Sequence, residues 1–143
     1  MLISTRGRYA LRVLVDMAER QSDACIPLKE VAERQDISEK YLESIGRDLV
    51  KHNIVSGVRG KGGGYQLKKA PDQINVGEIL RFMEGSLSPV ACLEEGAVPC
   101  ERASECRTLE FWRGLNDVID KYTSGYTLAD LMRNAQPGND YVI

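Results

Sequence analysis

The sequence predicts a mainly α-helical domain that carries one small β-hairpin and is extended by a long C-terminal helix. Three observations lead to this prediction. Apolar residues recur at helical spacing through most of the chain. One glycine-rich stretch, with the sequence SGVRGKGGGYQL, interrupts that pattern over residues 56–67. Large apolar side chains then repeat every three or four residues over residues 109–122.

The first predicted helix begins at Thr5, which can cap it, and ends near Gln21. Residues 22–26 are predicted to form a loop. Pro27 suits the first turn of a second helix, where the backbone N–H that proline lacks would be unpaired anyway. The side chains of the first helix that are expected to face the core are Tyr9, Ala10, Val13, Leu14, Met17 and Ala18.

A third helix is predicted after a short turn over residues 35–37. Ser38 is its expected N-cap, and the helix ends near His52, a candidate C-cap. Two short helices joined by a tight turn form a helix-turn-helix. The side chains of the third helix that are expected to be buried are Tyr41, Leu42, Ile45, Leu49 and Val50.

Two short strands are predicted over residues 54–59 and 65–69, on either side of the turn Gly60-Lys61-Gly62-Gly63-Gly64. Glycine accepts the positive backbone dihedrals that such a turn requires. The loop lacks P-loop spacing and leads into a strand, which argues against a nucleotide-phosphate site. The hairpin is therefore expected to be the wing of a winged helix-turn-helix.

The C-terminal half begins with a connector over residues 71–74 and a short helix from Asn75 to Glu84. An irregular stretch over residues 85–105 separates this helix from the long helix, which is predicted from about Cys106 to Tyr122. Thr127 can cap a last short helix that ends near Asn134. The broad apolar face of the long helix predicts packing either on its own domain or on another subunit.

Charge is distributed unevenly along the chain. Residues 1–69 hold 13 Lys and Arg against 9 Asp and Glu, a net of +4, whereas residues 70–143 hold 6 against 12, a net of −6. The sum is the overall charge of −2. A basic half can bind phosphates while an acidic half faces away or meets another protein, although chance gives the same asymmetry.

Composition limits the cellular setting. No run of 18 apolar residues occurs, so no transmembrane helix is expected. The charged N-terminus is unlike a secretory signal, which predicts a cytoplasmic protein without a membrane partner. Four cysteines in such a protein indicate metal binding, redox chemistry or core packing before structural disulfides.

The third helix and the wing carry the candidate DNA contacts. The N-terminal half of a recognition helix contacts base edges, and a carboxylate such as Glu43 accepts from a cytosine amine. A Glu43–Arg47 ion pair fits that spacing equally well. A slim cationic loop suits the narrow minor groove. The predicted DNA-contacting residues are Ser38, Lys40, Tyr41, Glu43, Arg47, Lys51, Arg59 and Lys61.

Several of these cationic residues have an alternative interpretation that does not involve DNA. Lys40, Arg47 and Lys51, together with Lys68 and Lys69 after the wing, are candidates for phosphate contacts. The same residues are equally consistent with a solvated surface. Arg59 and Lys61 are the stronger candidates because the glycine-rich turn carries them.

Four segments of the chain resemble the IscR/CymR family of bacterial winged-helix regulators: RGRYALRVLVDMA, ISEKYLESIGRDL, SGVRGKGGGYQL and ADLM. The resemblance extends over residues 1–134. It implies a homodimer held by the long C-terminal helix, with two winged domains on palindromic double-stranded DNA. It also implies that Glu43 and its neighbours read the major groove and that Arg59 enters the minor groove.

This resemblance suggests a division of the chain into four parts. Residues 1–84 are expected to form the winged helix-turn-helix domain, and residues 85–105 a cysteine-containing sensor loop. Residues 106–134 are expected to form the dimerisation helices, and residues 135–143 a flexible tail.

Cys92, Cys100 and Cys106 have the spacing C-x7-C-x5-C. Thiolates are the usual ligands of iron–sulphur clusters, and cluster-binding members of the family carry three cysteines in this position. The expected cofactor is an iron–sulphur cluster, [2Fe–2S] rather than [4Fe–4S]. A reduced trio of thiols, or a disulfide formed in air, is the alternative.

The fourth ligand of such a cluster is unknown. Leu109 stands where some family members have histidine, and Arg6 and Arg8 lie near the position where others have an acidic residue. The remaining candidates are a small molecule or one of the carboxylates Glu101, Glu105 and Glu110. Cys25, before the second helix, is expected to be an ordinary small residue, with a redox thiol as the alternative.

The sequence thus predicts a DNA-binding transcriptional regulator, a repressor, whose loop senses iron–sulphur or redox status. A first alternative is a metal-free regulator of cysteine metabolism, controlled by a partner protein or by thiol oxidation. A second is a module that binds only proteins. An enzyme is not expected, because no nucleophile–base pair stands out and the chain has a single histidine.

Overall fold

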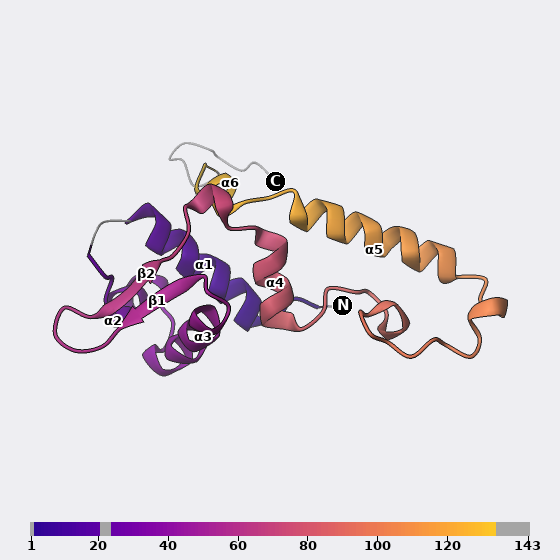
Figure 1. Ribbon diagram of the computed structural model, residues 1–143, viewed down its shortest axis with the longest axis horizontal. Coiled ribbons are helices and arrows are strands. Elements are labelled where there is room, and N and C mark those ends of the chain that lie inside the picture. The colour runs from indigo at the N-terminus through magenta and orange to yellow at the C-terminus, as the bar shows by residue number, and fades with distance from the viewer. Residues whose placement is uncertain (1, 21–23, 134–143) are drawn as a thin grey trace.

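The computed structural model describes residues 2–20 and 24–133, and its helices and hairpin follow the predicted order (Figure 1). The last predicted segment, residues 135–143, lies outside the described residues. The α-helices are α1 (Thr5–Glu19), α2 (Leu28–Gln35), α3 (Glu39–Lys51), α4 (Val76–Glu84), α5 (Leu109–Ser124) and α6 (Leu128–Arg133). The strands are β1 (Val55–Val58) and β2 (Gly64–Leu67), and the 3-10 helices are η1 (Pro71–Gln73), η2 (Ala91–Leu93) and η3 (Ala103–Glu105).

The core is one cluster to which α1, α2, α3, α4 and α6 all contribute, and α1 packs mainly against α4 and α6. Leu14 of α1 and Leu42 and Ile45 of α3 belong to this cluster, and none of the three has exposed surface. Burial of each such side chain stabilises the fold by roughly 1.5–3 kcal/mol. The predicted apolar stripe of α1 is confirmed, with Tyr9 at its half-buried edge.

Helix caps follow the predictions with two corrections, of which the first is that Pro27 precedes α2 as its N-cap, with extended backbone, instead of lying in its first turn. Ser38 accepts a hydrogen bond from the N–H of Tyr41 at 3.2 Å, which confirms it as the N-cap of α3. The cap of α1 is Ser4 instead of Thr5. Ser4 has extended backbone and its hydroxyl reaches the N–H of Gly7, whereas Thr5 is already inside the helix.

Asp16, buried in α1, holds α2 in place. Arg34 donates to both carboxylate oxygens of Asp16, with Nη2 at 2.6 Å and Nε at 3.1 Å, and Gln35 donates at 2.8 Å. Burial by itself raises the pKa of Asp16. The hydrogen bonds from Arg34 and Gln35 and the charges of Arg34 and Arg20 outweigh this, so the pKa of Asp16 lies below its ordinary value.

We therefore expect Asp16→Asn to lower the free energy of unfolding by about 1–3 kcal/mol at pH 7. A carboxyl whose folded pKa is depressed stabilises the fold above its unfolded pKa, which is roughly 3.9. That contribution is lost as the pH falls through the folded pKa. Urea unfolding of the wild type and of Asp16→Asn, at pH 7 and at lower pH, measures the difference between their free energies of unfolding. This difference should shrink as the pH falls. Glu33→Gln, an exposed change on α2, is the control, and a difference independent of pH would contradict the assignment.

The hairpin is antiparallel, with Val55 opposite Leu67 and Val58 opposite Gly64. An isolated bridge, absent from the sequence predictions, joins Ile26 to Tyr65. Their backbones exchange hydrogen bonds of 2.8 and 2.9 Å. A side chain at Gly64 would lie 2.2 Å from the Ile26 carbonyl oxygen, so this close approach requires glycine. The bridge attaches the wing to the segment that precedes α2.

Two further predictions are corrected by the structure. The long helix begins at Leu109 instead of Cys106, because Cys106, the residue after η3, has extended backbone and the apolar repeat starts at Leu109. Val50 is 39% exposed, although it was expected to be buried. It lies on the side of α3 that faces the wing, beside Gly57, and not on the side that faces α1.

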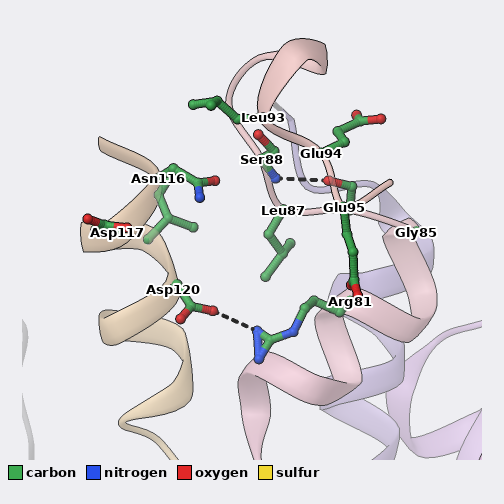
Figure 2. A pocket seen from close by; sticks show the side chains of 12 residues that line it. Arg81, Gly85, Leu87, Ser88, Leu93, Glu94, Glu95, Asn116, Asp117 and Asp120 are labelled. Carbon is green, nitrogen blue, oxygen red and sulfur yellow. Dashed lines mark hydrogen bonds and ion pairs between the residues drawn. The ribbon is translucent and has the colours of Figure 1, made fainter. Parts of the chain in front are cut away.

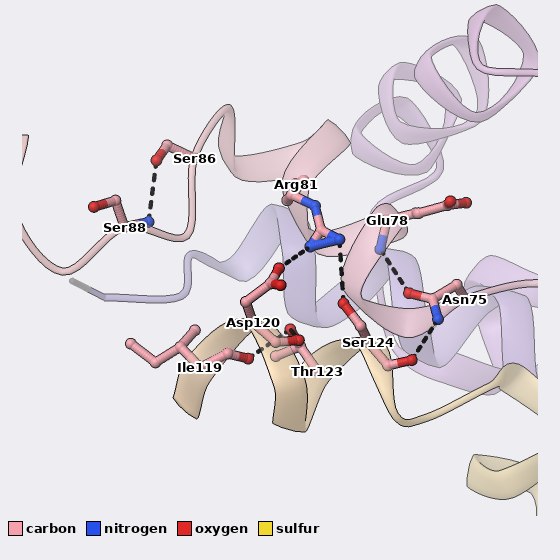
Figure 3. A network of polar contacts seen from close by, with 9 residues as sticks. All are labelled: Asn75, Glu78, Arg81, Ser86, Ser88, Ile119, Asp120, Thr123 and Ser124. Atoms are coloured by element: carbon pink, nitrogen blue, oxygen red, sulfur yellow. Dashed lines mark hydrogen bonds and ion pairs between the residues drawn. The ribbon is translucent and has the colours of Figure 1, made fainter. Parts of the chain in front are cut away.

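Helix α5 projects away from the winged part of the molecule (Figure 1). None of its side chains, all of which the structure describes, is buried. It is joined to α4 by Arg81, which donates to Asp120 at 3.1 Å and to Ser124 at 3.3 Å, and by Asn75, which donates to the Ser124 carbonyl at 2.7 Å (Figure 3). No helix within the described ranges combines the length and apolarity needed to span a bilayer.

Candidate nucleic-acid interface

The outer face of α3 presents the predicted contact residues to solvent. Leu42, Ile45 and Leu49 turn inward, so the intervening positions face outward. The Ser38 cap starts the helix at Glu39. The exposed predicted contacts on this face are Ser38, Lys40, Glu43, Arg47 and Lys51.

Tyr41 differs from the other predicted contacts because it is half-buried. Its ring meets the edge of Tyr9 with 5.9 Å between centroids, and its hydroxyl lies 3.3 Å from the hydroxyl of Thr5. Tyr41 therefore joins the start of α3 to the start of α1. Its half-buried side chain therefore lies at the edge of the outer face of α3.

Glu43 and Arg47 form no ion pair with each other within the part of the chain that the structure describes. Both line a cleft between α3 and the wing, together with Arg59. When a helix lies in a major groove and a wing lies in the adjacent minor groove, one phosphodiester strand passes between them. In this chain, side chains of both signs of charge line the space between α3 and the wing.

The turn of the wing is built from glycine. Gly60 and Gly62 have φ of 94° and 77°, and a side chain at Gly63 would lie 2.3 Å from the Val58 carbonyl oxygen. The turn is therefore slim, and Arg59 and Lys61 are exposed on it. A turn without bulky side chains beside its cations suits entry into a minor groove, which is about 6 Å wide.

A contact that the sequence analysis missed sets the position of the wing against α3. The ring of Tyr65 packs on Gly46, where a Cβ would lie 2.9 Å from both Cζ and Oη of the tyrosine. An isolated glycine inside a helical pattern often has such a packing reason, and Gly46 is therefore the signal that could have revealed the contact. Val58, 52% exposed on the wing, is a second missed residue that lines the cleft.

Gly46→Ala is expected to lower the free energy of unfolding by about 1–3 kcal/mol, because the added methyl overpacks against Tyr65. The double variant Gly46→Ala/Tyr65→Leu replaces the ring with a shorter side chain and should lose less stability than the sum of the two single changes. Urea unfolding measures the free energy of unfolding of the wild type, the two single variants and the double variant. Strictly additive losses would show that the two residues do not constrain each other.

Arg6 and Arg8 take different roles. Arg6 is half-buried and forms an ion pair with Asp48, and it also donates to the Ser44 hydroxyl at 3.2 Å. It therefore ties α1 to the C-terminal half of α3. Arg8 is exposed. After the wing, Lys68 donates to Asn53 at 3.3 Å, and Lys69 is exposed.

Cys92, Cys100 and Cys106 are exposed and unbridged, in or beside η2 and η3. Within the described residues, no group of three or more Cys, His, Asp and Glu side chains is placed to hold a metal ion. The thiols have the donor chemistry for an iron–sulphur cluster, but their arrangement in this single chain does not fit one. A hydrogen bond from Thr108, 3.5 Å away, lowers the pKa of Cys106. Cys25 is half-buried beside the Ile26 bridge.

A cavity lies beside the start of the cysteine loop, between the end of α4 and the middle of α5 (Figure 2). Leu87 and Ile119 contribute apolar surface to it, and Arg81 and Asp120 form their ion pair at its edge. Leu93 and Glu94, which follow Cys92, also line it. The cavity therefore marks the place where α4, the loop and α5 meet.

Comparison with known proteins agrees with this geometry. The chain matches the Rrf2 family, described as an iron-dependent transcriptional regulator, over residues 3–134. It is similar to the HTH-type transcriptional regulator IscR of Sodalis glossinidius (strain morsitans), with 37% identity over 136 residues that cover 95% of this chain and 81% of the relative.

Solved structures give the same result. The chain is similar to CymR (YrzC), the global cysteine regulator of B. subtilis, with 34% identity, a TM-score of 0.77 and coverage of 95% of this chain and 99% of the other. It is also similar to T. potens IscR, with 32% identity, a TM-score of 0.75 and coverage of 95% and 89%.

These similarities extend over the helix-turn-helix, the wing, the cysteine loop and α5. They confirm the predicted fold and the predicted function as a DNA-binding transcriptional regulator. The relatives are named as regulators, which agrees with the prediction that the protein is not an enzyme. The chain belongs to the Rrf2 family of transcriptional regulators.

Proposed function

We propose that this Rrf2 regulator binds a palindromic site in double-stranded DNA as a cytoplasmic homodimer and represses transcription from it. One observation carries the proposal: the exposed face of α3 and the slim cationic wing lie on opposite sides of one cleft. A helix for the major groove and a loop for the minor groove are thus placed to hold one strand between them.

Each side chain then has a role set by its chemistry. Ser38, Lys40 and Glu43 contact base edges, where a carboxylate accepts from the cytosine amine. Tyr41, at the edge of the exposed face of α3, contacts the DNA backbone. Arg47 and Lys51 hold phosphates on the strand in the cleft. On the wing, Arg59 enters the minor groove and Lys61 binds the adjacent phosphate.

The homodimer is supported by the exposed side of α5. Phe111, Val118 and Tyr122 are 66%, 63% and 66% exposed in the single chain and lie along one stripe. Neighbouring apolar side chains so exposed mark a surface that another protein covers. We assign the residues 106–134 to dimerisation, 1–84 to DNA binding and 85–105 to sensing.

Selection of duplexes from a random pool by the purified protein tests DNA binding and its symmetry together. The expected result is an inverted repeat whose half-sites match the spacing of two recognition helices. Affinity for the selected duplex should fall steeply with salt, because Lys and Arg displace counterions from phosphates. Failure to enrich any sequence, with affinity independent of salt, would favour the protein-interaction alternative.

For the loop, we propose that Cys92, Cys100 and Cys106 sense iron–sulphur or redox status. The proposal is supported by the family description and by three exposed thiols in the segment between α4 and α5. Since these thiols are not gathered in the single chain, a [2Fe–2S] cluster would need a rearranged loop and a fourth ligand from elsewhere. The resemblance to CymR supports a metal-free alternative, in which a protein partner or oxidation of Cys25 controls the regulator.

Absorption spectra and iron and sulphide contents of protein purified without oxygen separate these alternatives. Absorbance between roughly 320 and 460 nm that bleaches in air, with stoichiometric iron and sulphide, would establish a cluster. Changing the three loop cysteines to serine should then abolish the colour, whereas Cys25→Ser should not. A colourless, iron-free protein would favour the metal-free alternative.

A further inference from the structure

The last turn of α4 contacts three other helices through side chains that are nearly consecutive. The first contact is with α5, through Arg81. Its guanidinium donates to Asp120 and to the Ser124 hydroxyl, one helical turn apart on α5 (Figure 3). A guanidinium is planar and rigid, so two contacts fix its position along α5 more tightly than one would.

The second contact is with the recognition helix. The ring of Phe82 stacks on the imidazole of His52, with 4.0 Å between centroids and 1° between the ring planes. His52 is the C-cap of α3, and its backbone N–H reaches the carbonyls of Asp48 and Val50. A shift of Phe82 therefore acts directly on the end of the helix that presents Arg47 and Lys51.

The third contact is with the start of α1. Glu84 accepts hydrogen bonds from the backbone N–H and the hydroxyl of Ser4, at 3.0 and 2.8 Å. The carboxylate comes so close to α1 that a side chain at Gly7 would lie 2.3 Å from its oxygen. The next residue, Gly85, ends α4 with a φ of 81° and begins the cysteine loop.

These contacts limit how the parts of the molecule move. The three side chains leave α4 within its last turn, and backbone hydrogen bonds hold that turn to the preceding one, so the three side chains move together. A displacement of α5 or of the loop must therefore either break the contact at Arg81 or carry Phe82 with it. Packed elements shift between discrete arrangements in this way and do not deform continuously.

We propose that the last turn of α4, defined by Arg81, Phe82 and Glu84 and called here the coupling turn, transmits the position of α5 to the recognition helix. Phe82 is a positioning residue that acts on DNA binding through His52. The inference rests on the proposed function, because it needs α3 to bind DNA and α5 to join the subunits.

Amide hydrogen exchange of the full chain, with and without the selected duplex at saturation, tests the coupling turn. In the wild type, DNA should slow exchange in α3 and the wing, and should also change exchange in α4 and α5, which lie outside the DNA interface. In Phe82→Ala, DNA should still protect α3 and the wing, but the change in α5 should be lost. Phe82→Tyr keeps the stacked ring and should restore it.

Three further measurements sharpen the test. His52→Ala removes the other ring and should lose the same α5 response, which keeps the proposal testable if Phe82→Ala fails to fold. Val98→Ala, an exposed change in the loop, should behave as wild type. Phe82→Ala and Asp120→Asn should each weaken DNA affinity about 3- to 10-fold, and the double variant should lose no more than one of them, since both interrupt the same connection.

An α5 response that is the same in the wild type and in Phe82→Ala would overturn the coupling turn. So would a wild-type protein in which DNA protects α3 and the wing but leaves α5 unchanged. Absence of protection in α3 and the wing themselves would instead overturn the proposed function. The two failures are therefore distinguishable in one data set.

Discussion

Val118→Asp is expected to convert the homodimer into monomers and to weaken binding to the palindromic site by about 10²–10⁴-fold. The side chain lies on the stripe of α5 that also carries Phe111 and Tyr122 and is 63% exposed in the single chain. A carboxylate placed there would be buried without a partner when two subunits meet. A monomer binds only one half-site, so it lacks the added affinity that a dimer gains by binding both half-sites of the same duplex.

Size-exclusion chromatography with light scattering and fluorescence anisotropy would measure the two effects of Val118→Asp. Val118→Leu is the matched control, because it keeps the apolar surface and should remain dimeric with unchanged affinity. Circular dichroism checks that the helix survives, since aspartate costs only about 0.7 kcal/mol in a helix interior. A Val118→Asp protein that stays dimeric and binds normally would remove α5 from the proposed interface.

Arg59→Ala is expected to lower affinity for the selected duplex by about 1–3 kcal/mol, or roughly 5- to 150-fold. Arg59 stands at the base of the glycine turn and is exposed there. The enhanced negative potential of a narrow minor groove favours that cation and depends on sequence. Anisotropy titrations against the selected and a scrambled duplex, at several salt concentrations, would measure the loss.

Lys61→Ala is the matched control, since it removes a cation from the same turn. It should weaken binding to both duplexes to a similar extent and reduce the salt slope by about one. Arg59→Ala should instead weaken the selected duplex more than the scrambled one. Equal losses on the two duplexes for both variants would show that Arg59 contributes charge alone.

Much of the candidate DNA-binding surface was predictable because it depends on residues close together in the chain. Ser38 caps α3 from three residues away, and the positive φ angles at Gly60 and Gly62 are properties of the turn itself. The stripe of Leu42, Ile45 and Leu49 fixes which face of α3 turns inward and therefore which face remains outside. The family resemblance supplied the dimer and the cluster hypothesis, which local patterns alone would not have distinguished from other uses of an apolar helix and three thiols.

Only the tertiary structure decided how these pieces meet, because the deciding contacts join residues far apart in the sequence. Periodicity places Val50 on the apolar side of α3, but the wing leaves it 39% exposed. Nothing local links Phe82 to His52 or Glu84 to Ser4, and these contacts make the coupling turn. The cysteine spacing likewise names three thiols, whereas their distance from one another depends on how the chain between η2 and η3 folds back. Local sequence thus determined the elements and the faces they expose, and long-range packing determined which elements act on one another.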